Sequence, residues 1–253
     1  MFSDEKQAGA AGFCPNCGKE HHLPAAPALQ TALRLLHRLE NGDRIDFFGS
    51  AQQTTCRSAA TEYLWGAARG KMFGVMVALA PNGTEVCLRA FSGQYNGMWQ
   101  VPGWVDPVFD VAAFHQVHDA EEREIKVLSR QIDVLPPGTE QHRQLVRQRR
   151  EKSQQLMRTI HGLYRLRNFQ GQAAGLEELF PPGTGIPTGT GDCCAPKLLQ
   201  HAVKYSLQPL GLAEFYVGRE NSSGTRQHGR LYPSCRSKCY PILGFMLCGL
   251  GLT

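Results

Sequence analysis

Hydrophobic and polar residues follow two different periods in the first hundred residues of the chain. In residues 29–39, LQTALRLLHRL, the leucines recur at helical spacing, and the ENGDR that follows is typical of a helix end. Residues 70–93 instead hold two apolar runs on either side of PNG, which predicts a β-hairpin. We expect the aromatic, proline-containing stretch MWQVPGWVDPVF that comes next to pack across a sheet or to line a pocket.

Residues 119–168 return to a helical pattern that is interrupted once, by the tripeptide PPG at 136–138. Apolar side chains at helical spacing lie on both sides of this break: Ile125, Leu128, Ile132 and Leu135 before it, and Leu145, Leu156, Ile160 and Leu163 after it. The pattern predicts an inserted helical hairpin, similar to a short antiparallel coiled coil.

The last third of the chain alternates between helical and extended patterns. After the linker FPPGTGIPTGTG, residues 194–205 read as a helix, LGLAEFYVG as a buried strand, and YPSCRSKCYPILGFML as a loop that runs into a short apolar helix. We therefore expect one α/β domain over residues 28–253, with a mixed sheet, flanking helices and the helical hairpin inserted at 119–168. Residues 1–27, small and polar, are expected to form a flexible tail.

Composition places the chain among folded proteins. Its 253 residues are enough to bury a core, and 42% hydrophobic against 19% charged residues excludes a disordered chain. No signal-peptide pattern opens the sequence, and no apolar run reaches the ~18 residues of a membrane span, so we expect a cytoplasmic protein with no membrane partner. Nine cysteines in such a protein favour metal ligands or free thiols over a disulfide framework.

The order of the expected elements resembles that of the zinc-dependent deaminases, in which one ligand heads a helix after the first two strands and two cysteines head the next helix. Their signature is H-x-E followed by P-C-x-x-C. The resemblance implies a deaminase-like fold with zinc held by Cys193, Cys235 and Cys239. Cysteines at these positions suit a catalytic zinc ion, because helix N-termini stabilise thiolates and three protein ligands leave a fourth position for water.

The sequence departs from that signature in two respects. Its second pair is spaced C-x3-C, and no Glu stands beside the first thiol to move protons. Glu214, in the LAEFYVG strand, or Asp192 would have to approach from the side as the catalytic carboxylate. His228 offers an alternative, since with three cysteines it would complete a closed Cys3His structural site. Cys193 and its neighbour Cys194 read equally well as small buried residues, so which of them is a ligand stays open.

A second candidate metal site lies in CPNCGKEHH, near the N-terminus. Cys14 and Cys17 form a C-x2-C knuckle, and His21 or His22, or a partner chain, would have to complete it. The alternative is a flexible tail with two free thiols.

The second arm of the predicted helical hairpin is strongly basic. Residues 141–168 contain eight Lys or Arg against one acid, whereas the net charge of the whole chain is only +5. We expect this arm to contact an RNA phosphate backbone through Arg147, Arg149, Arg150 and Lys152. The alternative is a self-neutralising hairpin, because the first arm begins with the acidic DAEERE.

Several of these segments together resemble the long N-terminal extension of RluA-type bacterial RNA pseudouridine synthases. They are GKMFGVMV, AFSGQ, DPVFD, a charged insert that is shorter here, GTGDCCAPKLLQHA, PLGLAEFYVG and HGRLYPSCRSKCYPILGFML, in that order over about residues 70–248. The motif G-x-G-E-C-x-A-P-K-L-L of that extension favours Cys193 over Cys194 and includes Lys197. The synthase domain itself is not in this sequence, so the synthase reaction is not implied.

These patterns lead to three functional hypotheses. The leading one is a zinc-binding, RNA-associated accessory domain in RNA modification, whose partners are tRNA or rRNA and a separate pseudouridine synthase. The second is an active zinc-dependent base or nucleoside deaminase with Glu214 as acid and base. A thiol-redox protein that uses the paired cysteines is a third.

Overall fold

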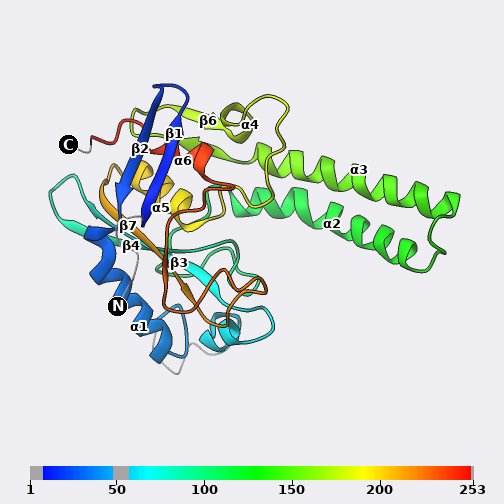
Figure 1. Cartoon of the computed structure of the whole chain (residues 1–253), viewed down its shortest axis with the longest axis horizontal. Helices are drawn as coiled ribbons and strands as arrows, with labels where there is room; N and C mark the ends of the chain where they lie inside the picture. The colour runs from blue at the N-terminus through cyan, green and yellow to red at the C-terminus, as the bar shows by residue number, and fades with distance from the viewer. Residues whose placement is uncertain (1–7, 48–56, 252–253) are drawn as a thin grey trace.

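The computed structural model describes residues 8–47 and 57–251. Their centre is a four-stranded sheet of order β4-β3-β7-β8, in which each neighbouring pair is antiparallel (Figure 1). The strands are β3 (Lys71–Leu79), β4 (Glu85–Phe91), β7 (Gln208–Val217) and β8 (Leu231–Tyr232). The hairpin predicted around PNG is therefore confirmed as β3 and β4, and the LAEFYVG strand as part of β7.

Helices cover both faces of this sheet, which confirms the α/β class. Alternate residues of β3 enter different cores: Phe73, Val75 and Val77 pack on the α1 side, and Met76 and Ala78 on the other. One face carries α1 (Leu29–Asn41), and the other carries α5 (Cys194–Lys204) and α6 (Tyr240–Leu247). Several short helices are also present: η1 (Ala26–Ala28), η2 (Arg57–Ala59), η3 (Thr61–Trp65) and α4 (Leu176–Leu179).

The predicted helical insertion consists of α2 (Val111–Asp133) and α3 (Glu140–Gly162), which extend away from the body (Figure 1). It begins earlier than predicted because Asp110 caps α2 by accepting a hydrogen bond from the Ala113 amide at 2.7 Å. It also ends earlier, since β5 (Arg165–Arg167) pairs with β6 (Ala173–Gly175). The first turn of α2 belongs to the body, where Phe114 makes an edge-to-face contact with Trp99 of the aromatic loop.

The N-terminal segment is folded from residue 8 onward, which corrects the expectation of a flexible tail. Strands β1 (Gly9–Cys14) and β2 (Lys19–Pro24) form an antiparallel hairpin that packs on α6. Ala10 and Leu23 are fully buried in the same core as α5 and α6. The sequence hid this packing because small side chains such as Ala and Gly do not form a visible apolar period. The first seven residues of the predicted tail lie outside the described residues.

Candidate metal centre

Four ligand side chains from the two ends of the chain meet beside the N-terminal hairpin. Cys14 ends β1, Cys17 lies in the turn, His21 lies in β2, and Cys248 follows α6. One ligand atom of each lies within 4.8 Å of the others. The Cys17 sulfur and the Nε2 of His21 are already 3.1 Å apart. Cys14 and Cys248 are buried, so the group lies at the edge of the core.

The hairpin turn brings the first three of these ligands together. Gly18 adopts a left-handed φ of +69°, and its amide donates to the Cys14 carbonyl at 2.9 Å. This tight turn places Cys17 over the end of β1, and the antiparallel pairing brings His21 back along β2. The predicted C-x2-C knuckle thus gains His21 as a neighbour, whereas His22, the next residue of the same strand, does not join the group.

Cys248 is the candidate ligand that the sequence does not reveal. It caps the C-terminus of α6 and reaches the hairpin because β1 and α6 approach each other closely at Gly12 and Gly244. Its only sequence signal is a cysteine directly after a very apolar helix, and nothing local relates that residue to Cys14. The contact between the two chain ends is a product of tertiary packing alone.

The electrostatics of this group favour a cation. Desolvation raises the pKa of the Cys17 thiol, but hydrogen bonds from the Lys19 amide and the neighbouring thiols outweigh it, so that pKa lies below its ordinary value. Burial, followed by hydrogen bonds with those thiols, raises the pKa of Cys248 to about 12. The Cys17 thiol thus ionises more readily than usual, and the Cys248 thiol less readily. A bound divalent ion would stabilise thiolates here, and three sulfurs with one imidazole match the tetrahedral preference of zinc.

The three cysteines predicted as zinc ligands form a second thiol group. Cys193 and Cys239 are the N-cap residues of α5 and α6, and Cys235 lies in the loop before α6. Hydrogen bonds with Cys235 and Cys239 raise the pKa of Cys193, and hydrogen bonds with Cys193 and Cys239 lower the pKa of Cys235. The structure therefore brings these side chains together. They do not meet the 4.8 Å mutual spacing that the first group meets.

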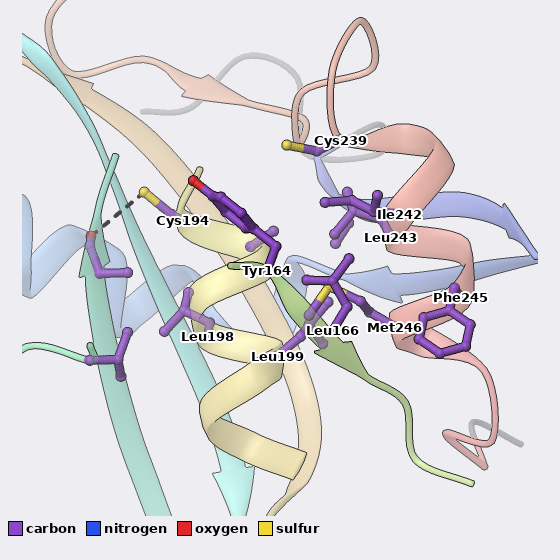
Figure 2. Close-up of a cluster of buried hydrophobic side chains, with 14 of the residues drawn as sticks. Tyr164, Leu166, Cys194, Leu198, Leu199, Cys239, Ile242, Leu243, Phe245 and Met246 are labelled. Carbon is purple, nitrogen blue, oxygen red and sulfur yellow. Dashed lines mark hydrogen bonds between the residues drawn. The ribbon is translucent and has the colours of Figure 1, made fainter. Parts of the chain in front are cut away.

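The structure distinguishes Cys193 from Cys194. The Cys194 thiol is fully buried against the sheet, where it donates to the carbonyls of Met72 and Ala90 at 3.5 and 3.7 Å. Figure 2 shows its sulfur directed at the neighbouring strand, away from Cys239 at the start of α6. A Cβ on Gly74 of β3 would lie 2.5 Å from the Cys194 Cβ, so this packing is tight. Cys194 is a core residue, and Cys193 faces the second thiol group.

Glu214 approaches that group from β7. Its carboxylate is buried and its Oε1 accepts hydrogen bonds from the Ala195 amide at 2.9 Å and the Ser234 hydroxyl at 3.1 Å. Burial raises the pKa of Glu214 to about 7. Ala195 lies two residues after Cys193, which is the position of Glu in H-x-E. A carboxylate from β7 thus lies beside the helix position at which the deaminase signature has a Glu.

The other polar residues of this motif connect the helix to its surroundings. The Asp192 carboxylate accepts a hydrogen bond from the Tyr164 hydroxyl at 2.5 Å, and burial raises its pKa. Lys197 is also buried, and its ammonium donates to the carbonyls of Phe91 and Gly93 at 2.9 and 2.8 Å. Lys197 therefore holds α5 against the end of β4.

His228 does not join the second thiol group, contrary to the expectation of a closed Cys3His site there. Its Nδ1 accepts a hydrogen bond from the Gly218 amide at 3.2 Å, and its Nε2 lies 2.8 Å from the carboxylate of Glu40 in α1. Its ring also packs on Trp65. Both ring nitrogens are therefore engaged at a different part of the sheet.

The four basic residues predicted to contact RNA divide into two pairs. Lys152 forms ion pairs with Glu121 and Glu124 of α2, and Arg147 with Glu140 at 3.4 Å. Within the described residues, Arg149 and Arg150 have no ion pair. They line a groove of about 550 Å³ between α3 and the loop at Gly185 and Ile186.

The same groove contains a buried histidine. His161 is 7% exposed, and its Nε2 has no hydrogen-bond partner among the described residues. Burial lowers its pKa. Arg158 also lines this groove, and no carboxylate does. The groove therefore combines three guanidinium groups with an imidazole nitrogen that has an unused hydrogen-bonding capacity.

Comparison of the chain with protein-family models, with curated proteins and with solved structures gave no match. Within the part of the chain that the structure describes, no helix has both the length and the apolar character needed to cross a bilayer.

Proposed function

We propose that this chain is a zinc-binding, RNA-associated accessory domain in RNA modification. The observation that carries the zinc part is the Cys14, Cys17, His21 and Cys248 group, whose four ligand atoms lie within 4.8 Å of one another. Four protein ligands fill the tetrahedral coordination of zinc and leave no position for water, which is the arrangement of a structural site. Zinc there would join the first strand to the last helix and so stabilise the whole fold.

His21→Ala tests this site, with His22→Ala as the matched control. The two histidines are neighbours in one strand, and successive side chains of a strand point to opposite faces. We expect about one equivalent of zinc in the wild type, at least tenfold weaker zinc binding in His21→Ala, and wild-type binding in His22→Ala. A zinc content below about a tenth of an equivalent in the wild type, after purification without chelator, would reject the proposal.

The RNA part rests on the α3 groove. Arg149, Arg150 and Arg158 line it, His161 adds a hydrogen-bonding nitrogen, and no carboxylate lines it. Guanidinium groups without carboxylate partners are suited to contact a phosphate backbone. The resemblance of residues 70–248 to an extension of RNA pseudouridine synthases supports RNA as the partner, with tRNA or rRNA as the substrate of a separate synthase.

Arg149→Gln/Arg150→Gln tests the groove, and Arg143→Gln/Arg147→Gln is its matched control. Both variants remove two positive charges from α3, but Arg143 and Arg147 are already paired with Glu140. We expect the first variant to weaken RNA binding and to reduce the salt slope by about one for each lost phosphate contact. The control should stay close to the wild type. If both variants lost RNA affinity equally, only the net charge of α3 would matter, and the groove would be rejected as the RNA contact.

A second candidate function is a base or nucleoside deaminase, and the position of Glu214 favours it. Cys193, Cys235 and Cys239 would hold a second zinc ion, whose chemistry is to activate water. Glu214, with a pKa of about 7, is suited to move a proton near neutral pH. Its hydrogen bond from the Ala195 amide would hold the carboxylate beside Cys193.

Zinc stoichiometry and ammonia release separate the two functions. A deaminase requires zinc that survives in His21→Ala, because Cys193, Cys235 and Cys239 would hold it. It also requires ammonia release from a cytosine- or adenine-containing nucleoside or RNA that Glu214→Gln reduces at least a hundredfold, while zinc content stays unchanged. If the wild type held one equivalent of zinc, lost it in His21→Ala and released no ammonia, the deaminase would be rejected and the accessory domain supported.

A further inference from the structure

Three arginines converge on a pocket that is remote from both thiol groups. The pocket, about 340 Å³, lies between α1 and the edge strand β4. Arg34 and Arg38 of α1 and Arg89 of β4 line it, and Thr31 contributes a hydroxyl. None of its lining residues carries a carboxylate; the remainder are Leu35, Val75, Cys87, Leu88 and Gly103.

The backbone holds Arg89 in a fixed position at this pocket. Its Nε donates to the Gly103 carbonyl at 2.6 Å. Gly103 has a φ of +80°, and a Cβ there would lie 2.4 Å from the Nη2 of Arg89, so only glycine leaves room for the guanidinium. Within the described residues the two terminal nitrogens of Arg89 have no hydrogen bond. They remain available to a ligand.

The three positive charges are not neutralised by the protein. Arg34 and Arg38 lie four residues apart on one face of α1, a spacing at which like charges repel. Among the described residues none of the three arginines has a carboxylate within ion-pair distance. Burial, and next the charge of Arg38, lower the pKa of Arg89. The pocket therefore has an unsatisfied positive potential.

Contact with an aromatic ring explains the position of only two of these three arginines. The guanidinium carbons of Arg38 and Arg89 lie 3.8 and 4.7 Å from the centre of the Phe47 ring. Arg34 has no such contact, and it is exposed on the same helix face. Among the described residues Arg34 has no ion pair or ring contact, so its charge adds to the other two and is free to meet an anionic ligand.

We propose that this pocket binds a doubly charged phosphate group, either a phosphate monoester or a diphosphate. Guanidinium groups donate paired hydrogen bonds to phosphate oxygens, and three of them match a group with two or more negative charges better than a carboxylate or a phosphodiester. The Thr31 hydroxyl supplies a further donor. The proposal depends on neither the zinc nor the RNA proposal, because the pocket shares no residue with those sites.

Isothermal titration of the full chain with inorganic phosphate and with pyrophosphate, in a chloride buffer free of sulfate, tests the site. We expect saturable binding by the wild type, about tenfold weaker binding by Arg34→Gln, and wild-type binding by Arg123→Gln. Arg34 and Arg123 are both exposed helix arginines, so the two variants carry the same charge change with little risk to the fold. Thermal unfolding of each variant without ligand checks that it is folded.

Two RNA oligonucleotides of one sequence, with a 5′-phosphate and with a 5′-hydroxyl, identify the source of the phosphate. Preference for the 5′-phosphate, lost in Arg34→Gln, supports the site with an RNA end as ligand; equal binding of both, with phosphate and pyrophosphate still bound, supports it with a small molecule as ligand. Absence of saturable binding of either anion by the wild type would overturn the proposal. Binding that Arg34→Gln leaves unchanged would overturn it as well.

Discussion

Lys197 carries a positive charge into the interior at the second turn of α5. Its side chain is 1% exposed, and its ammonium donates to the carbonyls of Phe91 and Gly93 and lies near the rings of Phe91 and Trp99. Burial lowers its pKa to about 8. The folded chain therefore releases this proton at a lower pH than an unfolded chain, in which the lysine pKa is near 10.5.

We expect Lys197→Met to change how stability depends on pH. Between about pH 8 and 10.5 the unfolded wild type binds more protons at this site than the folded protein, so Lys197 makes the free energy of unfolding rise with pH, by about 3 kcal/mol over that range. The methionine variant lacks this contribution. Urea unfolding at several pH values in reducing buffer should therefore show it losing stability relative to the wild type as pH rises. If the free energies of unfolding of the two proteins changed in parallel with pH, Lys197 would not have the lowered pKa of a buried charge.

In the GTGDCCAPKLLQHA motif, which also contains Lys197, the sequence could not show which of two neighbouring cysteines faces the second thiol group. Cys193 and Cys194 are adjacent and chemically identical, but the first caps α5 and the second lies inside its first turn, so their thiols point in different directions. Helix boundaries read from sequence are uncertain by more than one residue. Glu214 was identified as a candidate, but its hydrogen bond from Ala195 depends on the pairing of β7 with β3.

At the level of elements, the contact between β1 and α6 connects the fold to the candidate zinc site. A Cβ on Gly244 of α6 would lie 2.1 Å from the carbonyl carbon and oxygen of Phe13, and a Cβ on Gly12 would lie 2.2 Å from the Gly244 amide. Backbone thus lies directly against backbone. This approach places Cys14 at the end of β1 within reach of Cys248 at the end of α6.

We expect Gly244→Ala to weaken zinc binding about tenfold although residue 244 is no ligand. Relative to glycine, alanine stabilises an isolated helix by about 1 kcal/mol. Here, however, its methyl group would push the hairpin away from α6, and this overpacking would cost about 1–3 kcal/mol. Zinc affinity from competition with a chromophoric chelator, and the free energy of unfolding, are the measurements.

Gly162→Ala is the control for that substitution. Gly162 also lies in a helix, at the end of α3, and a Cβ there would meet no atom within 4 Å. This variant should bind zinc as the wild type does and be equally or slightly more stable. Wild-type zinc affinity in Gly244→Ala would mean that the approach of β1 to α6 does not position the ligands.

For the whole molecule, sequence patterns were sufficient wherever the signal is local. The periods of α1, α2 and α3, the PNG turn and the β7 strand all depend on residues within one element, and the structure confirms them. The Cys14 and Cys17 knuckle is equally local. Cys248 is not, because it joins the knuckle only after the last helix packs on the first strand. Long-range packing of small residues leaves no periodic trace in the sequence.

The helical hairpin is the one large part of the described molecule that extends from the body (Figure 1). Its base belongs to the core through Phe114 and Leu156, whereas Leu128 and Ile132 are buried within the hairpin and join neither core cluster. Lys152 of α3 lies 3.3 Å from a carboxylate oxygen of Glu121 in α2, so the two helices are adjacent at that level. A short turn can join them there.

Replacing residues 122–151 with Gly-Asn-Gly-Gly should therefore leave the body folded and weaken RNA binding. We expect zinc content, and phosphate binding at Arg34, to match the wild type, because both sites lie in the body, and the melting temperature to change by only a few degrees. RNA affinity should fall toward that of Arg149→Gln/Arg150→Gln or below it, since the groove loses both arginines. Loss of zinc in the shortened chain would show that the hairpin is needed to fold the body. Undiminished RNA binding would place the RNA contact elsewhere on the molecule.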